Sequence, residues 1–106
     1  ITFDDFTKVE LRVAKILECE KVPKAKKLYK IQLDDGMGGR QIVSGIAQHY
    51  TPEELIGKKI VVVANLKPVK LCGVESYGML LAGDREDGSV CVNFIDDSVP
   101  VGTRLH

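Results

Sequence analysis

The sequence predicts an all-β domain that folds as a small closed barrel with one short helix. Three observations support this prediction. Five or more apolar segments of strand length follow one another, turn residues separate them at short intervals, and only one segment carries the signals of a helix start. The chain has 106 residues, of which 44% are hydrophobic, so it is long enough for one domain with its own core. We therefore expect a single domain over residues 1–106.

The first three strands are expected at 11–22, 27–34 and 40–44. Alternation of apolar and polar residues breaks at Ala14-Lys15-Ile16, which predicts a β-bulge in the first strand. The second strand alternates well and places three apolar side chains on one face: Tyr29, Ile31 and Leu33. The glycine-rich segment 35–39 predicts a hairpin turn between the second and third strands.

The segment Thr51-Pro52-Glu53-Glu54 predicts the start of the helix. Threonine is a common N-cap, proline suits the first helical position, and a glutamate three residues after the cap completes a capping box. Gly57 is a suitable residue to end this helix after about two turns.

After the helix, residues 59–64 form a nearly continuous apolar run, which is typical of a strand buried on both faces. Pro68 and Gly73 indicate a loop at 65–75. The remaining expected elements are a strand at 77–82, a polar turn at 84–88, and short strands at 90–95 and 99–105.

The helix lies between the third and fourth main strands, which is its position in an OB-type barrel. An SH3-like barrel is the alternative. We expect a five-stranded barrel over about residues 8–83 and a C-terminal extension of short strands over about residues 84–106.

Charge is distributed unevenly along a chain whose net charge is zero. Residues 1–20 carry a net charge of −2, residues 21–70 carry +6, and residues 71–106 carry −4. A basic middle between acidic ends can place a positive face on a neutral protein, as nucleic-acid binding requires. A solvated lysine-rich surface is the alternative interpretation.

Composition excludes several other kinds of function. The cysteines and histidines are few and scattered, so no metal site, disulfide framework or catalytic group is predicted. They are Cys19, Cys72, Cys91, His49 and His106. The odd cysteine count indicates a reducing, cytoplasmic compartment. The longest apolar run, at 60–64, is too short to span a membrane. The acidic start predicts no signal peptide, and the missing initiator Met suggests an excised domain.

One segment has the composition of a binding loop. Residues 65–71 directly follow the buried strand, and loops on a rigid scaffold often carry binding residues. Lys67 and Lys70 are placed to contact phosphates, and Asn65 to read a base edge or a 2′-hydroxyl. Ser76 and Met79 lie close enough in sequence to join them, although Met79 could instead fill the core.

Three motifs resemble those of a known family: Phe3-Asp4-Asp5-Phe6-x-Lys8-Val9-x-Leu11-Arg12-Val13, Val43-Ser44-Gly45-Ile46, and Asn65-Leu66-Lys67-Pro68-x-Lys70-Leu71-x-Gly73-x-x-Ser76-x-Gly78-Met79. With these motifs the chain closely resembles the tRNA-binding OB-fold domain appended to the C-terminus of many bacterial methionyl-tRNA synthetases. The same family occurs as a free tRNA-binding protein, in phenylalanyl-tRNA synthetase β chains and in synthetase-associated cofactors. The resemblance covers about residues 2–106.

The resemblance implies an OB-fold, homodimerisation and recognition of tRNA by shape. It implies RNA contacts at eight positions: Arg12, Lys27, Arg40, Asn65, Lys67, Lys70, Ser76 and Met79. Two residues depart from the family pattern, Ala14 where glycine is common and Lys26 where aspartate is common. The extra lysine leaves open whether Lys26 or Lys27 makes the contact.

We therefore interpret the chain as a non-catalytic, cofactor-free tRNA-binding module that would serve the catalytic body of a methionyl-tRNA synthetase. A chaperone-like or scaffold protein-binding module of the same barrel family is the alternative, and the basic middle favours RNA. Apolar residues persist in 84–106 and at Phe3 and Phe6, which predicts a homodimer through both chain ends. The alternative is that this tail folds back on its own barrel.

Overall fold

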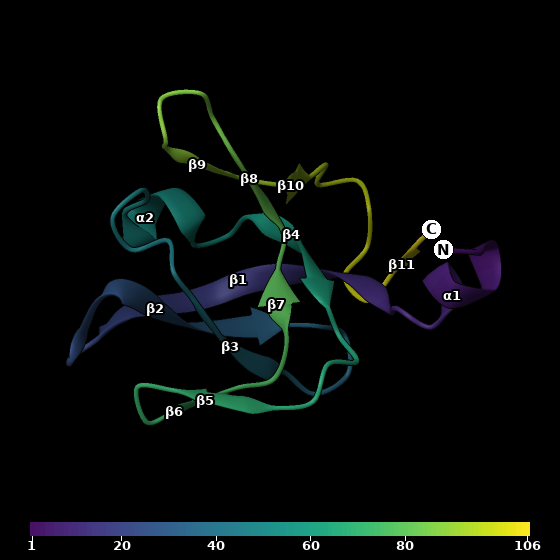
Figure 1. The fold of residues 1–106 in the computed structure, drawn as a ribbon, viewed down its shortest axis with the longest axis horizontal. Helices are drawn as coiled ribbons and strands as arrows, with labels where there is room; N and C mark the ends of the chain where they lie inside the picture. Colours follow the sequence, from purple (N-terminus) through teal and green to yellow (C-terminus); the bar gives the residue numbers. More distant parts are fainter.

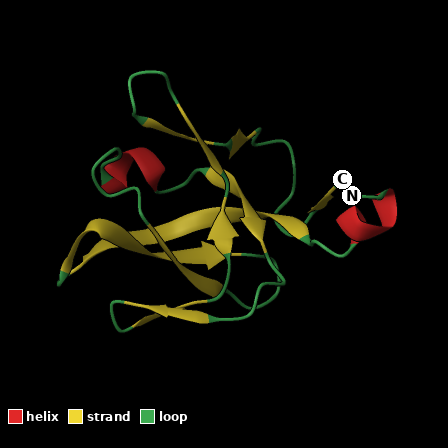
Figure 2. Cartoon of the chain, viewed as in Figure 1, coloured by secondary structure: helices red, strands yellow, loops and turns green.

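The computed structural model describes residues 1–106 as a chain dominated by strands, which make up 47% of it. The helices are α1 (Phe3–Thr7) and α2 (Pro52–Leu55). The strands are β1 (Leu11–Val22), β2 (Ala25–Asp34), β3 (Arg40–Ser44), β4 (Lys59–Val63), β5 (Val69–Leu71), β6 (Val74–Ser76), β7 (Met79–Leu80), β8 (Ala82–Asp84), β9 (Val90–Val92), β10 (Phe94–Ile95) and β11 (Arg104–Leu105). Figures 1 and 2 show strands curling around a common centre, with α2 at one side. The prediction of an all-β domain with a helix between the third and fourth main strands is confirmed.

Strand β1 is the centre of the main antiparallel sheet, whose order is β10-β4-β1-β2-β3. Residues 11–15 of β1 pair with β4, and residues 15–22 pair with β2. Between these halves the register with β2 shifts at Ile16 and Glu18, just after the predicted position of the bulge. One long strand therefore joins both sides of the sheet, because the shift lets it change partner while it bends.

Strand β3 forms one edge of the main sheet, and residues 75–77 cover this edge through hydrogen bonds that involve side chains. The backbone N–H of Tyr77 donates to the Gln41 carbonyl at 2.9 Å. The Gln41 side chain donates to the Glu75 carbonyl at 2.8 Å, and the Val43 N–H donates to the Ser76 hydroxyl at 2.9 Å. The segment around β6 thus covers the edge of β3 without a regular strand ladder.

The core lies inside this curled sheet and is closed by α2. Twelve buried residues form one cluster: Ala14, Ile16, Tyr29, Ile31, Leu33, Ile42, Ile46, Leu55, Ile60, Val62, Leu80 and Val92. The predicted core face of β2 is confirmed, and so is the burial of β4 on both faces, since Ile60 to Val63 are at most 6% exposed. The Tyr29 hydroxyl donates to the Tyr50 carbonyl at 2.6 Å, which ties the loop before α2 to the core.

Two elements differ from the sequence prediction in the first half and middle of the chain. Helix α1 was not predicted, although Thr2 and Asp5 form a capping box around its first turn. The predicted loop at 65–75 contains the hairpin β5–β6, whose turn includes Cys72 and Gly73 in positive-φ conformations. Such short elements lack the periodicity that a longer strand or helix shows.

The predicted strands at 77–82, 90–95 and 99–105 are each shorter or divided in the structure. The first splits into β7 and β8 and the second into β9 and β10, because the chain changes pairing partner at Leu81 and Asn93. Of the third, only Arg104–Leu105 is a strand, since the preceding residues turn at Pro100 and Gly102.

The C-terminal extension folds back onto the main sheet of its own chain. Strand β10 pairs with β4, and β11 pairs with β1 beside it. The Arg104 guanidinium donates to the Thr7 carbonyl at 2.9 Å, so α1 and β11 lie side by side and the two chain ends meet (Figure 1). Neither helix is long and apolar enough to cross a membrane.

We predict that Gly78→Ala destabilises the fold, because Gly78 has φ +151° and an added Cβ would lie 2.8 Å from the Val63 carbonyl oxygen. The expected loss is about 2 kcal/mol of unfolding free energy in urea denaturation. Gly45→Ala is the matched control, since nothing lies within 4 Å of its added Cβ. A loss at Gly78 no larger than that at Gly45 would contradict this packing.

Candidate nucleic-acid interface

Five of the eight residues implied as RNA contacts are exposed, and four of these do not use their side chains in hydrogen bonds within the protein. These four are Lys27, Lys67, Lys70 and Met79. Lys67 and Lys27 make no ion pair, and the Lys70 ammonium lies 3.9 Å from the Glu75 carboxylate at the surface. Met79 is 49% exposed, so it does not fill the core. All four side chains reach the solvent, and only Lys70 has a charged partner, in an exposed ion pair.

Asn65, by contrast, uses its side chain inside the protein. Its amide nitrogen donates to the Lys8 carbonyl at 2.6 Å, and its amide oxygen accepts from the Glu10 N–H at 2.9 Å. The neighbouring Ala64 N–H donates to the Glu10 carbonyl at 2.8 Å. Asn65 therefore fastens the segment after α1 to the beginning of the lysine-bearing loop.

Ser76 is similarly occupied at the other end of that loop. Its side chain is buried, and the residue is 2% exposed. The hydroxyl accepts from the Val43 N–H and donates to the Gly78 carbonyl at 3.0 Å. A serine hydroxyl has one proton to donate, and here it is already used.

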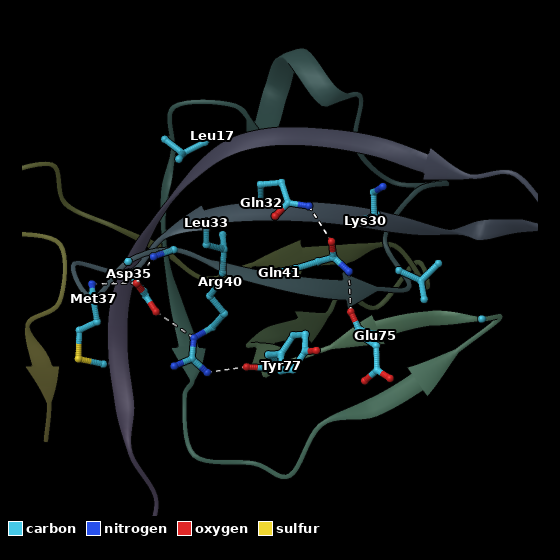
Figure 3. A pocket seen from close by; sticks show the side chains of 14 residues that line it. Leu17, Lys30, Gln32, Leu33, Asp35, Met37, Arg40, Gln41, Glu75 and Tyr77 are labelled. Carbon is cyan, nitrogen blue, oxygen red and sulfur yellow. Dashed lines mark hydrogen bonds and ion pairs between the residues drawn. The ribbon is translucent and has the colours of Figure 1, made fainter.

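Arg40 joins both ends of the loop. Its Nη1 donates to the Ala64 carbonyl at 2.7 Å and to the Tyr77 carbonyl at 2.5 Å. Its Nε lies 3.2 Å from the Asp35 carboxylate, and the Arg40 side chain is only 16% exposed. Figure 3 shows the guanidinium between Asp35 and Tyr77. A single cation thus holds the entry and exit of the loop together.

Arg12 also makes internal contacts, near the chain ends. Its Nε lies 2.7 Å from the Glu10 carboxylate, and its Nη1 donates to the Gly102 carbonyl at 3.0 Å. The guanidinium is therefore largely engaged by groups of the chain itself.

We call residues 65–77 the lysine arm, because they carry Lys67, Lys70 and the hairpin β5–β6. Both ends of the arm are held by hydrogen bonds from Asn65, Ser76 and Arg40. Binding charges on a segment that is already ordered lose less conformational entropy on contact with a ligand. The arm is thus a preorganised support for its two lysines.

A groove with a volume of about 980 Å³ runs beside the arm, and we call it the amide groove. Figure 3 shows Gln32 and Gln41 meeting at its centre, Leu17 of β1 on one side, and Glu75 and Tyr77 of the arm on the other. The lining residues are Leu17, Lys30, Gln32, Leu33, Asp35, Met37, Gly38, Gly39, Arg40, Gln41, Gly73, Val74, Glu75 and Tyr77.

The sequence prediction missed most of this groove. Only Arg40 among the lining residues was a candidate contact. Leu17 carried a usable signal in the sequence, because it is a large apolar residue directly after Ile16, and neighbours in a strand point to opposite faces. In the structure Ile16 is buried and Leu17 is 49% exposed. The pairing of Gln32 with Gln41 depends on strand register, which the sequence alone did not specify.

The cysteines and carboxylates do not gather into a reactive cluster. No group of three histidine, cysteine or acidic side chains is placed to hold a metal ion. Burial, with the Glu20 and Glu53 carboxylates nearby, raises the pKa of the Cys19 thiol to about 11. At neutral pH this thiol is protonated, and a protonated thiol is a poor nucleophile.

The chain is similar in sequence to one part of much longer proteins. The family model described as a putative tRNA binding domain matches residues 11–104. Methionine–tRNA ligase of Bacillus subtilis is 61% identical over 105 residues, which are 99% of this chain and 16% of that protein. Methionine–tRNA ligase of Thermotoga maritima is 64% identical over 105 residues, which are again 99% of this chain and 16% of that protein. The chain therefore spans less than a fifth of the length of these relatives.

Solved structures with the same fold cover the whole chain. A MetRS-related protein from Pyrococcus horikoshii superposes with a TM-score of 0.95 at 44% identity, over 100% of this chain and 97% of that chain. The chaperone CsaA from Bacillus anthracis superposes with a TM-score of 0.88 at 31% identity, over 100% of this chain and 98% of that chain.

We predict that the Asp35–Arg40 pair makes stability depend on acid pH. Burial alone would raise the pKa of Asp35, but hydrogen bonds from the Met37 and Gly39 N–H groups and the Arg40 charge outweigh it, so the pKa is lowered. A lowered pKa stabilises the fold above the unfolded-state value of about 3.9, and this contribution is lost as pH falls through the folded-state pKa.

Urea unfolding at a series of pH values between about 7 and 2 measures this effect. Asp35→Asn should lower stability at neutral pH and flatten the acid limb of the stability profile. Asp97→Asn is the control, because the Asp97 side chain is exposed and accepts no hydrogen bond. Equal acid limbs for Asp35→Asn and the unsubstituted chain would refute the assignment.

Proposed function

The chain belongs to the putative tRNA-binding domain family, and on this basis we propose that it binds folded tRNA with the exposed cations of the lysine arm and the β1–β2 hairpin. The observation that carries this proposal is the arm itself: Lys67 and Lys70 project from a segment whose ends are internally fastened. Ammonium groups carried on an ordered backbone segment can bind phosphates without reading bases.

The eight implied contacts divide into two groups in this proposal. Lys27, Lys67, Lys70 and Met79 contact the RNA, and exposed Lys26 is available beside Lys27. The other four support the interface from within: Arg12, Arg40, Asn65 and Ser76. Their polar atoms already have partners in the protein, so they position the lysine-bearing surface.

The length of the relatives supports a role as an appended domain. Because this chain matches only 16% of the B. subtilis ligase, we propose that it acts next to a synthetase catalytic body in the cytoplasm. In that setting it adds phosphate contacts to those of the catalytic body, and linked binding sites raise overall affinity through effective concentration. Recognition by fixed cations favours the shape of the folded RNA over one anticodon.

Binding of an unfolded protein is the second candidate function. The chaperone CsaA shares the fold, and the amide groove contains exposed Leu17 and Met37. These apolar groups are separated by polar side chains, whereas a groove for unfolded chains would be more continuously apolar. We therefore favour tRNA.

We also propose a homodimer through the chain ends. Although the tail folds back onto the main sheet, a pocket of about 250 Å³ stays open between α1 and β11. Its lining residues are Phe3, Phe6, Thr7, Val9, Arg104, Leu105 and His106. Phe3 is 76% exposed and Ile1 fully exposed beside it. A two-fold interface at this place would cover these apolar groups and leave both lysine arms free.

We predict that tRNA affinity falls steeply with salt, because each lysine that neutralises a phosphate releases counterions. With about three phosphate contacts, the slope of log affinity against log salt concentration should be roughly −2 to −3. Fluorescence titrations at several salt concentrations measure it. An unstructured RNA of equal length is the control and should bind more weakly; no tRNA binding at low salt would refute the function.

We predict that Lys67→Ala combined with Lys70→Ala weakens tRNA binding and reduces the salt slope by about 2, since two phosphate contacts are removed. The fold should stay intact, because both side chains are exposed. Arg85→Ala, in the turn between β8 and β9, is the matched control and should bind like the unsubstituted chain.

Arg40→Gln separates positioning from contact in the same titration. If Arg40 supports the lysine arm, affinity falls while the salt slope stays unchanged, because no phosphate contact is lost. A slope reduced by about 1 would instead make Arg40 a phosphate ligand.

We predict a dimer at micromolar concentration in light scattering coupled to size exclusion. Phe3→Asp should shift the mass to that of one chain, because a charge buried in the apolar contact is unfavourable. Phe94→Asp is the control, since Phe94 is also exposed but lies on β10, away from α1. A monomeric unsubstituted chain would refute the dimer.

A further inference from the structure

We propose that the amide groove takes one unstacked nucleobase of the bound tRNA, while the lysine arm holds the phosphates next to it. This inference rests on the proposed tRNA binding and adds a second kind of contact to it. Three features of the groove support it: its charges are paired, its floor offers free amide groups, and its sides carry apolar surface.

The charged groups that line the groove already have partners. Lys30 lies 2.6 Å from the Glu20 carboxylate, and Arg40 lies 3.2 Å from Asp35. The Glu75 carboxylate faces Lys70 at 3.9 Å. A ligand that enters the groove therefore meets little unbalanced charge, which suits the uncharged base of a nucleotide better than its phosphate.

The floor of the groove is a pair of neutral amides. Gln32 and Gln41 are direct neighbours across β2 and β3, and Gln32 Nε2 donates to Gln41 Oε1 at 2.8 Å. Gln41 Nε2 donates in turn to the Glu75 carbonyl at 2.8 Å, which orients the pair. The amide oxygen of Gln32 accepts no hydrogen bond within the protein. A glutamine amide with a free acceptor can bind the edge of a base.

The sides of the groove are suited to the faces of a base. Leu17 of β1 and Tyr77 of the lysine arm lie on opposite sides of the amide pair (Figure 3). They are 49% and 43% exposed, although both are large side chains. A base that stacks on the tyrosine ring would cover this surface, and such stacking accepts any base because every base has an aromatic face.

The position of Tyr77 connects the groove to the lysine arm. Arg40 holds its carbonyl, and its N–H donates to the Gln41 carbonyl at 2.9 Å, so the backbone below the ring is fixed. The Tyr77 hydroxyl makes no hydrogen bond in the protein. A nucleotide whose phosphate meets Lys70 would therefore have its base next to an ordered ring.

An extended peptide fits the groove less well. Peptides that bind to a sheet commonly add a strand to a free edge. Here the edge of β3 is occupied, because the Tyr77 N–H and the Ser76 hydroxyl already bond to Gln41 and Val43. The remaining free polar group on the floor belongs to a side chain, which is the usual reader of a base edge.

The test compares the affinities of the 106-residue chain and four variants for tRNA, each at several salt concentrations. Tyr77→Ala removes the ring and Tyr77→Phe keeps it. Gln32→Leu removes the free amide with little change of volume, and Gln48→Leu makes the same change at an exposed site outside the groove. Urea unfolding of each variant verifies that it is folded.

We expect Tyr77→Ala to weaken binding about tenfold, as the loss of one stacked base would. Gln32→Leu should weaken it about fivefold through the lost hydrogen bond. Tyr77→Phe and Gln48→Leu should bind like the unsubstituted chain, and all salt slopes should be equal, since no phosphate contact changes.

Other results overturn the inference in distinguishable ways. If Tyr77→Ala and Gln32→Leu bind tRNA normally while the double lysine variant does not, the base site is wrong and the proposed function stands. A reduced salt slope in either groove variant would mean that the change disturbs the lysines. Displacement of tRNA by an unfolded polypeptide, with Tyr77-dependent affinity, would make the groove a peptide site. If the unsubstituted chain binds no tRNA, both proposals fail.

Discussion

The guanidinium of Arg40 is the contact on which the arrangement of this surface depends. It reaches the carbonyls of Ala64 and Tyr77, which stand at the two ends of the lysine arm, and the carboxylate of Asp35 in the β2–β3 turn. Asp35 in turn accepts the N–H groups of Met37 and Gly39. Because this carboxylate is almost fully buried, the pair is shielded from water and orders the turn and the arm together.

Asn65 and Ser76 complete this support by a different means. Each is a small polar side chain that satisfies backbone groups left without strand partners, at Lys8 and Glu10 in one case and at Val43 and Gly78 in the other. Where segments meet without a regular strand ladder, such groups stay unpaired unless side chains or water bond to them. The polar residues of the family motif thus have a structural reason to be present, while the lysines between them stay free for a partner.

The exposed positive charges and the neutral groove lie at different places on the surface of the protein. Exposed lysines project from the arm and the β1–β2 hairpin, whereas the groove between them holds paired ions and neutral amides. Residues 1–20 and 71–106 have a net negative charge, and the exposed apolar residues Ile1 and Phe3 lie at the N-terminal end. In our proposals, this separation gives one small domain a phosphate-binding surface, a neutral groove and a self-association surface at the chain ends.

The sequence by itself determined the elements with strong local signals. Strand β1 and strand β3 have the predicted bounds, α2 begins at the predicted capping box, and the apolar run of β4 is buried on both faces. Alternation, capping and apolar runs are local properties, so they can be read along the chain. The motif of the lysine arm likewise identified the family and pointed to Lys67 and Lys70.

Only the tertiary structure decided what the polar residues of that motif do. Nothing local distinguishes Lys67, which faces solvent, from Asn65 and Ser76, each of which has a hydrogen-bond partner more than thirty residues away in sequence. The same holds for the amide groove, where strand register pairs Gln32 with Gln41 and the hydrogen bond from Arg40 to the Tyr77 carbonyl holds Tyr77 beside them. A side chain's role depends on whether the fold supplies a partner for it, and partners that are distant in sequence are brought together only by the tertiary fold.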